Sequence, residues 1–261
     1  MSAANDNLDD GPTEDAFLGG KLMMLQARHG FRAGIDSVLL GACADVSKGS
    51  KVLDAGCGAG VAGLCLATRV FGTELTGIDK NAEAIALANR NAASNKFGNR
   101  ARFLEADVFD AADAVGADQF DHVISNPPFH DAANERPSPD EGKATAHGFV
   151  DQASYREAMS KWIKGCLRTL KTKGGITLVN RIAALPAMLA ALDGPTGAIE
   201  VVPLLPFDFV PAKRVIIRAK KGAKSPMVLH PGIALHQAEG GFTPQIEAAL
   251  RNGAALNVTT A

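Results

Sequence analysis

The sequence predicts an α/β fold in which a doubly wound, mostly parallel sheet is covered by helices on both faces. From residue 51 onward, short apolar runs rich in β-branched residues alternate with helical segments, which is the pattern of such sheets. A glycine-rich turn follows the first run, and acidic residues end three successive runs. The 261 residues are enough for one large domain with an ample core.

The region before the sheet is predicted to be a tail and a short extension. Residues 1–13 are polar, acidic and without periodicity, so we expect a disordered tail. Residues 14–261 are then a single domain, in which 14–45 is an N-terminal extension. Residues 16–26 read as two short strands around a glycine turn, and Asp36 is placed to cap the apolar helix that follows.

Seven strands and four further helices are expected in the rest of the chain. The strands are placed at 51–56, 74–79, 102–107, 120–126, 174–180, 199–205 and 214–220, and the helices at 61–71, 81–95, 152–171 and 183–192. No helix is expected between the last two strands. This favours an antiparallel hairpin, so we expect a seven-stranded, Rossmann-like sheet with an antiparallel edge strand.

Composition indicates a soluble cytoplasmic protein. Hydrophobic residues make up 46% of the chain and charged residues 21%, and no apolar run approaches the roughly 20 residues that span a bilayer. Cys43, Cys57, Cys65 and Cys166 have no paired or metal-like spacing, so buried free thiols are expected, with no metal. The sequence leaves the oligomeric state open.

The charge distribution keeps a nucleic-acid partner possible although the net charge is −1. Residues 1–20 carry five acids and no base, so residues 21–261 hold 27 bases against 23 acids. Residues 213–224 contain six bases and no acid. A charge run is more often a solvated face than a binding site, so this stretch is only suggestive.

The glycine turn DAGCGAG, residues 54–60, is the first candidate binding element. Gly56, Gly58 and Gly60 permit a tight turn and close backbone approach, and the next helix offers free N–H groups. The spacing G-x-G-x-G differs from the dinucleotide fingerprint G-x-G-x-x-G. An acid at Asp54 is unfavourable beside a pyrophosphate but suits a cationic amino group, such as that of S-adenosylmethionine.

Two further acids complete the predicted cofactor site. Asp79 ends the second strand, where a carboxylate accepts hydrogen bonds from a ribose diol, and Asp107 ends the third, where it can meet an adenine amino group. A single acid there is often only a helix cap. Three acids after three successive strands share one edge of an open sheet, which is where ligands bind.

At this point the sequence resembles a known family. VLDAGCGAG, GID, EAD and SNPPF, in this order, are similar to the motifs of class I methyltransferases that use S-adenosylmethionine, over roughly residues 30–180. In that family the fourth strand ends in a catalytic tetrapeptide [DNS]-P-P-[YFW]. The resemblance assigns this role to Asn126, Pro127, Pro128 and Phe129, and Asn126 also borders the cofactor.

The tetrapeptide suits methylation of an exocyclic amino group on a flat ring. The Asn126 side-chain oxygen and the Pro127 carbonyl are two acceptors for its N–H groups, which stabilises the positive charge that grows on nitrogen. Each proline restricts its predecessor to an extended conformation and so holds the acceptors in place. Phe129 is expected to stack on the ring. The alternative is a loop that merely ends a strand.

The segment GGKLMMLQARHGFRAGIDSVLLGA resembles the motif with which amino-methylating members complete the cofactor pocket. The resemblance lets Arg32 pair with the cofactor carboxylate and places Asp36 in the pocket. A surface arginine and a plain helix cap are the alternatives. His130 adjoins the tetrapeptide, and a solvated loop histidine is the simpler interpretation.

The whole-chain pattern resembles most the bacterial tRNA(Val) adenine-N6-methyltransferases, which act on an anticodon loop. A tRNA partner is therefore expected. The ribosomal RNA guanine-N2-methyltransferases are an alternative, although they usually carry a second, duplicated domain that this sequence lacks. Methylation of a release-factor glutamine is a third, for which NPPY is expected. A dinucleotide oxidoreductase fits the sheet but not the glycine spacing, and a non-catalytic binding module leaves the tetrapeptide unexplained.

Overall fold

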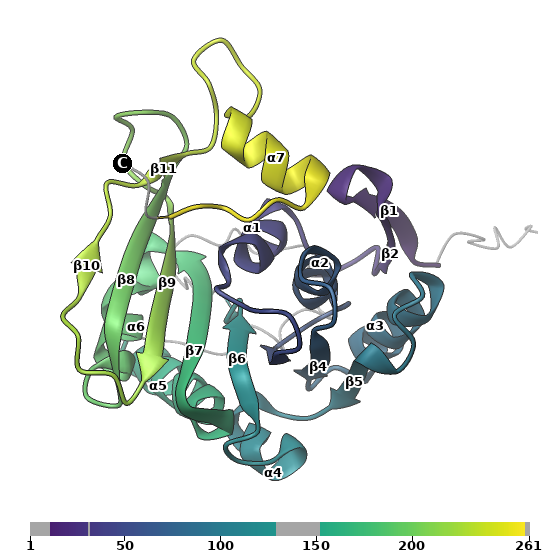
Figure 1. The fold of residues 1–261 in the computed structure, drawn as a ribbon, viewed down its shortest axis with the longest axis horizontal. Helices are drawn as coiled ribbons and strands as arrows, with labels where there is room; N and C mark the ends of the chain where they lie inside the picture. The colour runs from purple at the N-terminus through teal and green to yellow at the C-terminus, as the bar shows by residue number, and fades with distance from the viewer. Residues whose placement is uncertain (1–10, 31, 129–151, 259–261) are drawn as a thin grey trace, which may run out of the picture.

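The computed structural model describes residues 11–30, 32–128 and 152–258. Within them, one nine-stranded sheet carries helices on both faces, and a separate two-stranded hairpin lies at its side (Figure 1). The predicted doubly wound, mostly parallel α/β fold is confirmed. The predicted tail falls mostly outside these residues, and Thr13 already belongs to the first strand.

The large sheet has the strand order β10-β8-β9-β7-β6-β3-β4-β5, and β11 also pairs with β8. Its strands are β3 (Lys51–Ala55), β4 (Glu74–Asp79), β5 (Ala101–Glu105), β6 (Phe120–Ser125), β7 (Leu170–Arg181), β8 (Thr196–Leu205), β9 (Arg214–Lys221), β10 (Val228–Leu229) and β11 (Ile233–Ala234). Strands β3 to β7 are mutually parallel, so their last residues meet at one edge, which we call the carboxyl edge.

Helices divide between two hydrophobic cores, one on each face of the sheet. One core is formed with α1 (Ile35–Cys43), α2 (Val61–Arg69), α3 (Ala82–Ser94) and α7 (Pro244–Asn252), and the other with α4 (Ala111–Val115), α5 (Gln152–Thr169) and α6 (Leu185–Leu192). Short 3₁₀ turns include η1 (Leu18–Gly20), η2 (Gly98–Arg100), η3 (Val108–Asp110) and η5 (Ile182–Ala184). The four cysteines are free and buried, as predicted.

The predicted antiparallel hairpin is present and is formed by β8 and β9. The antiparallel strand itself was predicted at the edge of the sheet, but β9 lies inside the sheet. Strand β9 pairs with β7 on one side and with β8 on the other, antiparallel to both. After β7 the chain runs through α6 to β8, which lies two positions from β7 in the sheet. The chain then turns back, and β9 occupies the position between β8 and β7. Strands β10 and β11 then pair with the outer side of β8.

The chain also continues beyond the last strand that the sequence predicted. Helix α7 packs against α1 and η1, and the Leu256 N–H donates to the Ala42 carbonyl at 3.0 Å. This segment covers the face that holds the N-terminal extension. In the extension, β1 (Thr13–Phe17) and β2 (Leu22–Gln26) form the predicted pair of strands.

Candidate active site at the carboxyl edge

The glycine turn between β3 and α2 is held against the neighbouring strand β4. The N–H groups of Gly56 and Cys57 both donate to the Ile78 carbonyl, at 2.8 and 2.9 Å. Gly56 has a φ of 73° and Gly60 a φ of 83°, a region that L side chains rarely adopt. A Cβ at Gly56 would lie 2.7 Å from the Trp162 ring. Glycine is therefore required here by both backbone conformation and packing.

Asp54 lies beneath this turn and is almost fully buried, at 2% exposure. Its Oδ2 accepts the Gly63 N–H of α2 at 2.8 Å. Burial raises the pKa of the Asp54 carboxyl to about 7, the Gly63 N–H opposes that rise, and the nearby Asp79 adds to it. A buried carboxyl that is poised near neutral pH gains its charge readily when a cation binds beside it.

Asp79 and Asp107 stand at the carboxyl edge but already accept backbone hydrogen bonds. The two Asp79 oxygens accept from the Gly58 N–H and the Asn81 N–H, each at 2.9 Å. Asp107 caps η3 by accepting the Phe109 N–H at 2.9 Å. A carboxylate has about four acceptor positions, so both residues retain capacity for a ligand. Their roles in ribose and adenine binding stay predictions.

Asn126 follows β6 directly and carries an acceptor without a partner. Its Oδ1 is buried and makes no hydrogen bond within the described part of the chain. The preceding residue is fixed from two sides, because Ser125 Oγ donates to the Ala55 carbonyl at 2.6 Å and accepts from Trp162 Nε1 at 2.9 Å. Trp162 on α5 therefore links the glycine turn to the strand that presents Asn126.

Pro127 is buried and Pro128 is exposed. The Pro127 carbonyl accepts a hydrogen bond from Asn180 Nδ2 at 3.3 Å, and Asn180 itself is only 1% exposed. Sequence reasoning missed Asn180, which ends a predicted strand with no motif around it. Its amide occupies one acceptor position of the Pro127 carbonyl and leaves a second, since a carbonyl oxygen has two lone pairs. Phe129 and His130 lie outside the described residues.

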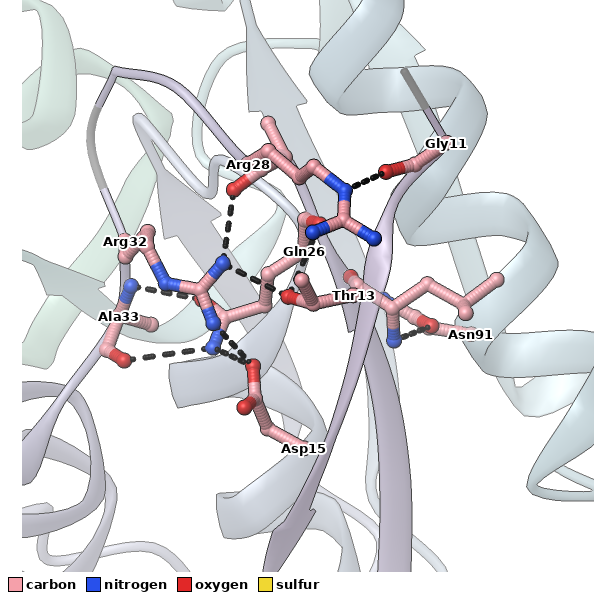
Figure 2. A network of polar contacts seen from close by, with 10 residues as sticks. Gly11, Thr13, Asp15, Gln26, Arg28, Arg32, Ala33 and Asn91 are labelled. Carbon is pink, nitrogen blue, oxygen red and sulfur yellow. Dashed lines mark hydrogen bonds and ion pairs between the residues drawn. The ribbon is translucent and has the colours of Figure 1, made fainter. Parts of the chain in front are cut away.

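Arg32 is engaged by the N-terminal hairpin (Figure 2). Its guanidinium donates to Asp15 Oδ2 at 2.6 Å, to Thr13 Oγ1 at 2.7 Å and to the Ala27 carbonyl at 3.0 Å. Gln26 joins the network, donating to Asp15 Oδ2 at 2.8 Å. Arg32 thus has a structural partner in this structure, and its contact with a cofactor carboxylate stays a prediction.

Asn91 on α3 ties this hairpin to the glycine turn. Its Oδ1 accepts the Leu25 N–H at 2.7 Å, and its Nδ2 donates to the carbonyls of Leu25 and Ala59 at 3.0 and 2.9 Å. Asn95, one helical turn later, makes the same paired contacts with Met23. The two side-chain amides thus bond the backbone of β2 as a neighbouring strand would. The spacing of four in NRNAASN was the sequence signal for this role.

Asp36 lies in the first turn of α1, whose cap position is Gly34, so the predicted capping role of Asp36 is wrong. Its Oδ2 instead forms an ion pair with Arg214 Nε at 2.5 Å, and its Oδ1 is buried without a partner among the described residues. Asp36 therefore joins the N-terminal extension to the start of β9. Its predicted place in the cofactor pocket stays a prediction.

The basic stretch 213–224 does not form one surface. Arg214 pairs with Asp36, Arg218 with Glu200 at 2.9 Å, and Lys221 with Asp118 at 2.8 Å. Because β9 is antiparallel to β7, its first residue lies at the carboxyl edge and its last at the opposite edge. Residues 213 and 214 thus lie at the same edge of the sheet as Asn126, with β7 between β9 and β6.

The carboxyl edge therefore gathers a glycine turn, a buried carboxyl near neutral pKa and two adjacent acceptors on Asn126 and Pro127. Within the described residues, no three His, Cys, Asp or Glu side chains are grouped so as to hold a metal ion. None of the helices in this part of the chain is long and apolar enough to cross a membrane.

This chain is similar to known methyltransferases in sequence and in fold. Residues 32–156 match the family described as "Methyltransferase small domain". A tRNA1(Val) (adenine(37)-N6)-methyltransferase from a Flavobacteriaceae bacterium is 38% identical over 142 residues, covering 54% of this chain and 57% of that protein. A release factor glutamine methyltransferase from Chlorobaculum tepidum is 41% identical over 87 residues, covering 33% and 29%.

Six further relatives share the description of the first, with identities from 27% to 37%. The chain matches about half or less of the length of the first relatives. A crystal structure of a predicted O-methyltransferase from Agrobacterium tumefaciens has a TM-score of 0.69 and 24% identity, covering 87% of this chain and 100% of that one. This likeness shows the class I methyltransferase fold.

Proposed function

We propose that the chain transfers a methyl group from S-adenosylmethionine to an exocyclic amino group, because residues 32–156 match the methyltransferase small domain family. The proposed acceptor is N6 of an adenine in a tRNA anticodon loop. The observation that carries the proposal is the buried Asn126 Oδ1, which has no hydrogen-bond partner among the described residues and adjoins the Pro127 carbonyl. A buried acceptor without a partner costs free energy, so it fits a donor that the substrate supplies.

The two acceptors supply what such an amino group needs. Its lone pair is delocalised into the ring, so the nitrogen is a poor nucleophile. Asn126 Oδ1 and the Pro127 carbonyl can each accept one N–H, which favours a tetrahedral nitrogen and stabilises the positive charge that develops on it. Asn180 and the Ser125–Trp162 contact hold the two acceptors in position before substrate arrives.

The residues at the glycine turn fit S-adenosylmethionine, which supplies an electrophilic methyl group when bound. Asp54 would favour the cationic amino group of the ligand, and Asp79 would accept hydrogen bonds from its ribose. The glycines of the turn, Gly56, Gly58 and Gly60, would let the ligand approach the backbone closely. Asp107 would meet the adenine. The proposal is supported by the spare acceptor positions of these carboxylates and by the raised pKa of Asp54.

The relatives favour an RNA adenine as the substrate. Seven of the relatives compared are tRNA1(Val) adenine methyltransferases, whereas one acts on a release factor. An unpaired loop base also costs least to bring into a pocket. The release factor relative keeps glutamine as a second candidate, since its side-chain amide presents an N–H₂ group to the same two acceptors.

One experiment separates these substrates. Labelled S-adenosylmethionine is supplied with total tRNA, ribosomal RNA and release factor in parallel, and the products are digested to nucleosides or amino acids. We expect label in N6-methyladenosine from tRNA. Label only in ribosomal RNA guanine, or only in protein, would overturn the substrate and leave the methyl transfer intact. No label in any arm, from protein that binds the cofactor, would overturn both.

A further inference from the structure

The loop between β8 and β9, residues 206–213, leaves the sheet at the carboxyl edge and displays an aromatic ring to solvent. The Phe209 side chain is fully exposed, and its φ of 61° is one that a bulky residue rarely adopts. Exposing a phenylalanine ring and straining its backbone both cost free energy. Backbone strain of this kind clusters at functional sites, so the loop is a candidate binding element.

The base of this loop is anchored, so Phe209 is presented from a defined position. The Phe207 ring packs against His236 with centroids 5.6 Å apart, and His236 stacks on Phe242 at 4.9 Å. The Val210 N–H donates to the Phe207 carbonyl at 3.2 Å. Beside the Phe209 ring is an open hollow of about 310 Å³, lined by prolines and aliphatic side chains that include Pro211 and Pro231.

The charges around the loop favour a nucleic acid as its partner. Lys213 is exposed and has no ion pair within the described residues, and Arg214 keeps 39% of its side chain exposed although it pairs with Asp36. Asp208 is the single acid of the loop. An exposed aromatic ring in the same loop as an exposed cation is suited to an unpaired base, because the ring can stack on the base while the cation contacts a phosphate.

The position of the loop relative to Asn126 suits a nucleotide that flanks the target. Strands β6, β7, β9 and β8 are consecutive neighbours in the sheet. The register aligns Ser125 with Leu178, Ile217 and Val201, so the ends of the loop lie three to four residues further along their strands. At about 4.8 Å per strand and 3.3 Å per residue, the ends of the loop lie roughly 14–20 Å from the end of β6. This separation suits contacts of the loop and of Asn126 with different parts of one ligand.

We propose that Phe209 is a stacking platform for an unpaired base next to the target nucleotide, and that Lys213 contacts the adjoining phosphate. The inference rests on the proposed function, because it requires an RNA substrate. It assigns part of the RNA-binding surface to the β8–β9 loop and away from Lys220 and Lys221, which lie at the opposite edge of the sheet.

The test compares Phe209→Ala with Phe71→Ala, a matched variant at another exposed phenylalanine. Phe71 is 71% exposed and precedes the start of β4, at the edge opposite Asn126. An unmodified tRNA1(Val) transcript and its anticodon stem–loop are the probes. We expect Phe209→Ala to weaken binding of both about 5- to 150-fold, the range for loss of one base–aromatic stack. Phe209→Trp should restore binding, and Phe71→Ala should bind as the wild type does.

Salt dependence separates stacking from charge. The log–log slope of affinity against salt should be unchanged in Phe209→Ala and smaller by about 0.7 in Lys213→Ala. Equal binding by Phe209→Ala and Phe71→Ala, with the wild type still methylating tRNA, would overturn this inference alone. If the wild type methylates only protein, the proposed substrate fails as well. A loss of release factor methylation in Phe209→Ala would assign the loop to a protein and overturn the inference.

Discussion

Replacing Asp54 by asparagine tests whether the cofactor's cationic amino group lies beside this buried carboxyl. With a pKa of about 7, the Asp54 carboxyl is mostly protonated at pH 6 and mostly ionised at pH 8. A cation that binds next to it favours the ionised form, so binding releases the proton. The expected release from Asp54 is about 0.9 proton at pH 6 and about 0.1 at pH 8, and cofactor affinity should rise about tenfold between them.

Titration calorimetry with S-adenosylhomocysteine measures this release directly. Heats recorded in two buffers of different ionisation enthalpy yield the number of protons that leave the protein. Asparagine keeps an oxygen that can accept the Gly63 N–H but has no proton to lose, so Asp54→Asn should lack the pH 6 release. Subtracting the variant also removes any titration of the ligand's own amino group. Equal release by both proteins would refute the placement of the amino group.

The same pKa shift affects the stability of the protein without cofactor. The pKa of the Asp54 carboxyl is about 7 in the folded protein, against 3.8 for a free carboxyl. Between these values the folded state binds more protons than the unfolded state, so stability falls as pH rises from about 4 to 7 and levels off above. Asp54→Asn should flatten this part of the curve, measured by urea unfolding at each pH.

Three further changes test the site. Asn126→Ala should lower kcat on the order of 10²–10³-fold, as for loss of one preorganised polar group, with cofactor affinity unchanged by calorimetry; a parallel loss of affinity would contradict its role. Asp79→Ala should weaken cofactor binding by roughly 1.5–3 kcal/mol, and because Asp79 also holds the Gly58 N–H, Asp79→Asn is the milder comparison. Asn180→Asp removes the donor to the Pro127 carbonyl. The kcat of Asn180→Asp should fall about 2- to 13-fold, which corresponds to the free energy of one hydrogen bond. It should recover relative to the wild type at low pH, where the protonated Asp carboxyl can donate again. An unchanged pH profile would refute a positioning role for Asn180.

The sequence alone predicted the features that depend on neighbours along the chain. Local periodicity predicted the alternating strands and helices. The residue types predicted the glycine turn and the acids that follow three of the strands. Some local signals were present but unused. Thr243, Pro244 and Gly253 delimit α7 with the usual start and stop residues, and Asn91 and Asn95 share one helix face.

Only the tertiary structure decided which side chains are partners, because those contacts join residues that are far apart in sequence. Asn180 meets Pro127 because β7 pairs with β6, and Arg214 meets Asp36 across 178 residues because β9 inserts beside β7. Arg32, which lies between β2 and α1, pairs with Asp15 on β1. Residue type and spacing indicated which groups can bind a charged ligand. Burial and pairing decide which of those groups still have an acceptor to offer, and both are properties of the folded chain.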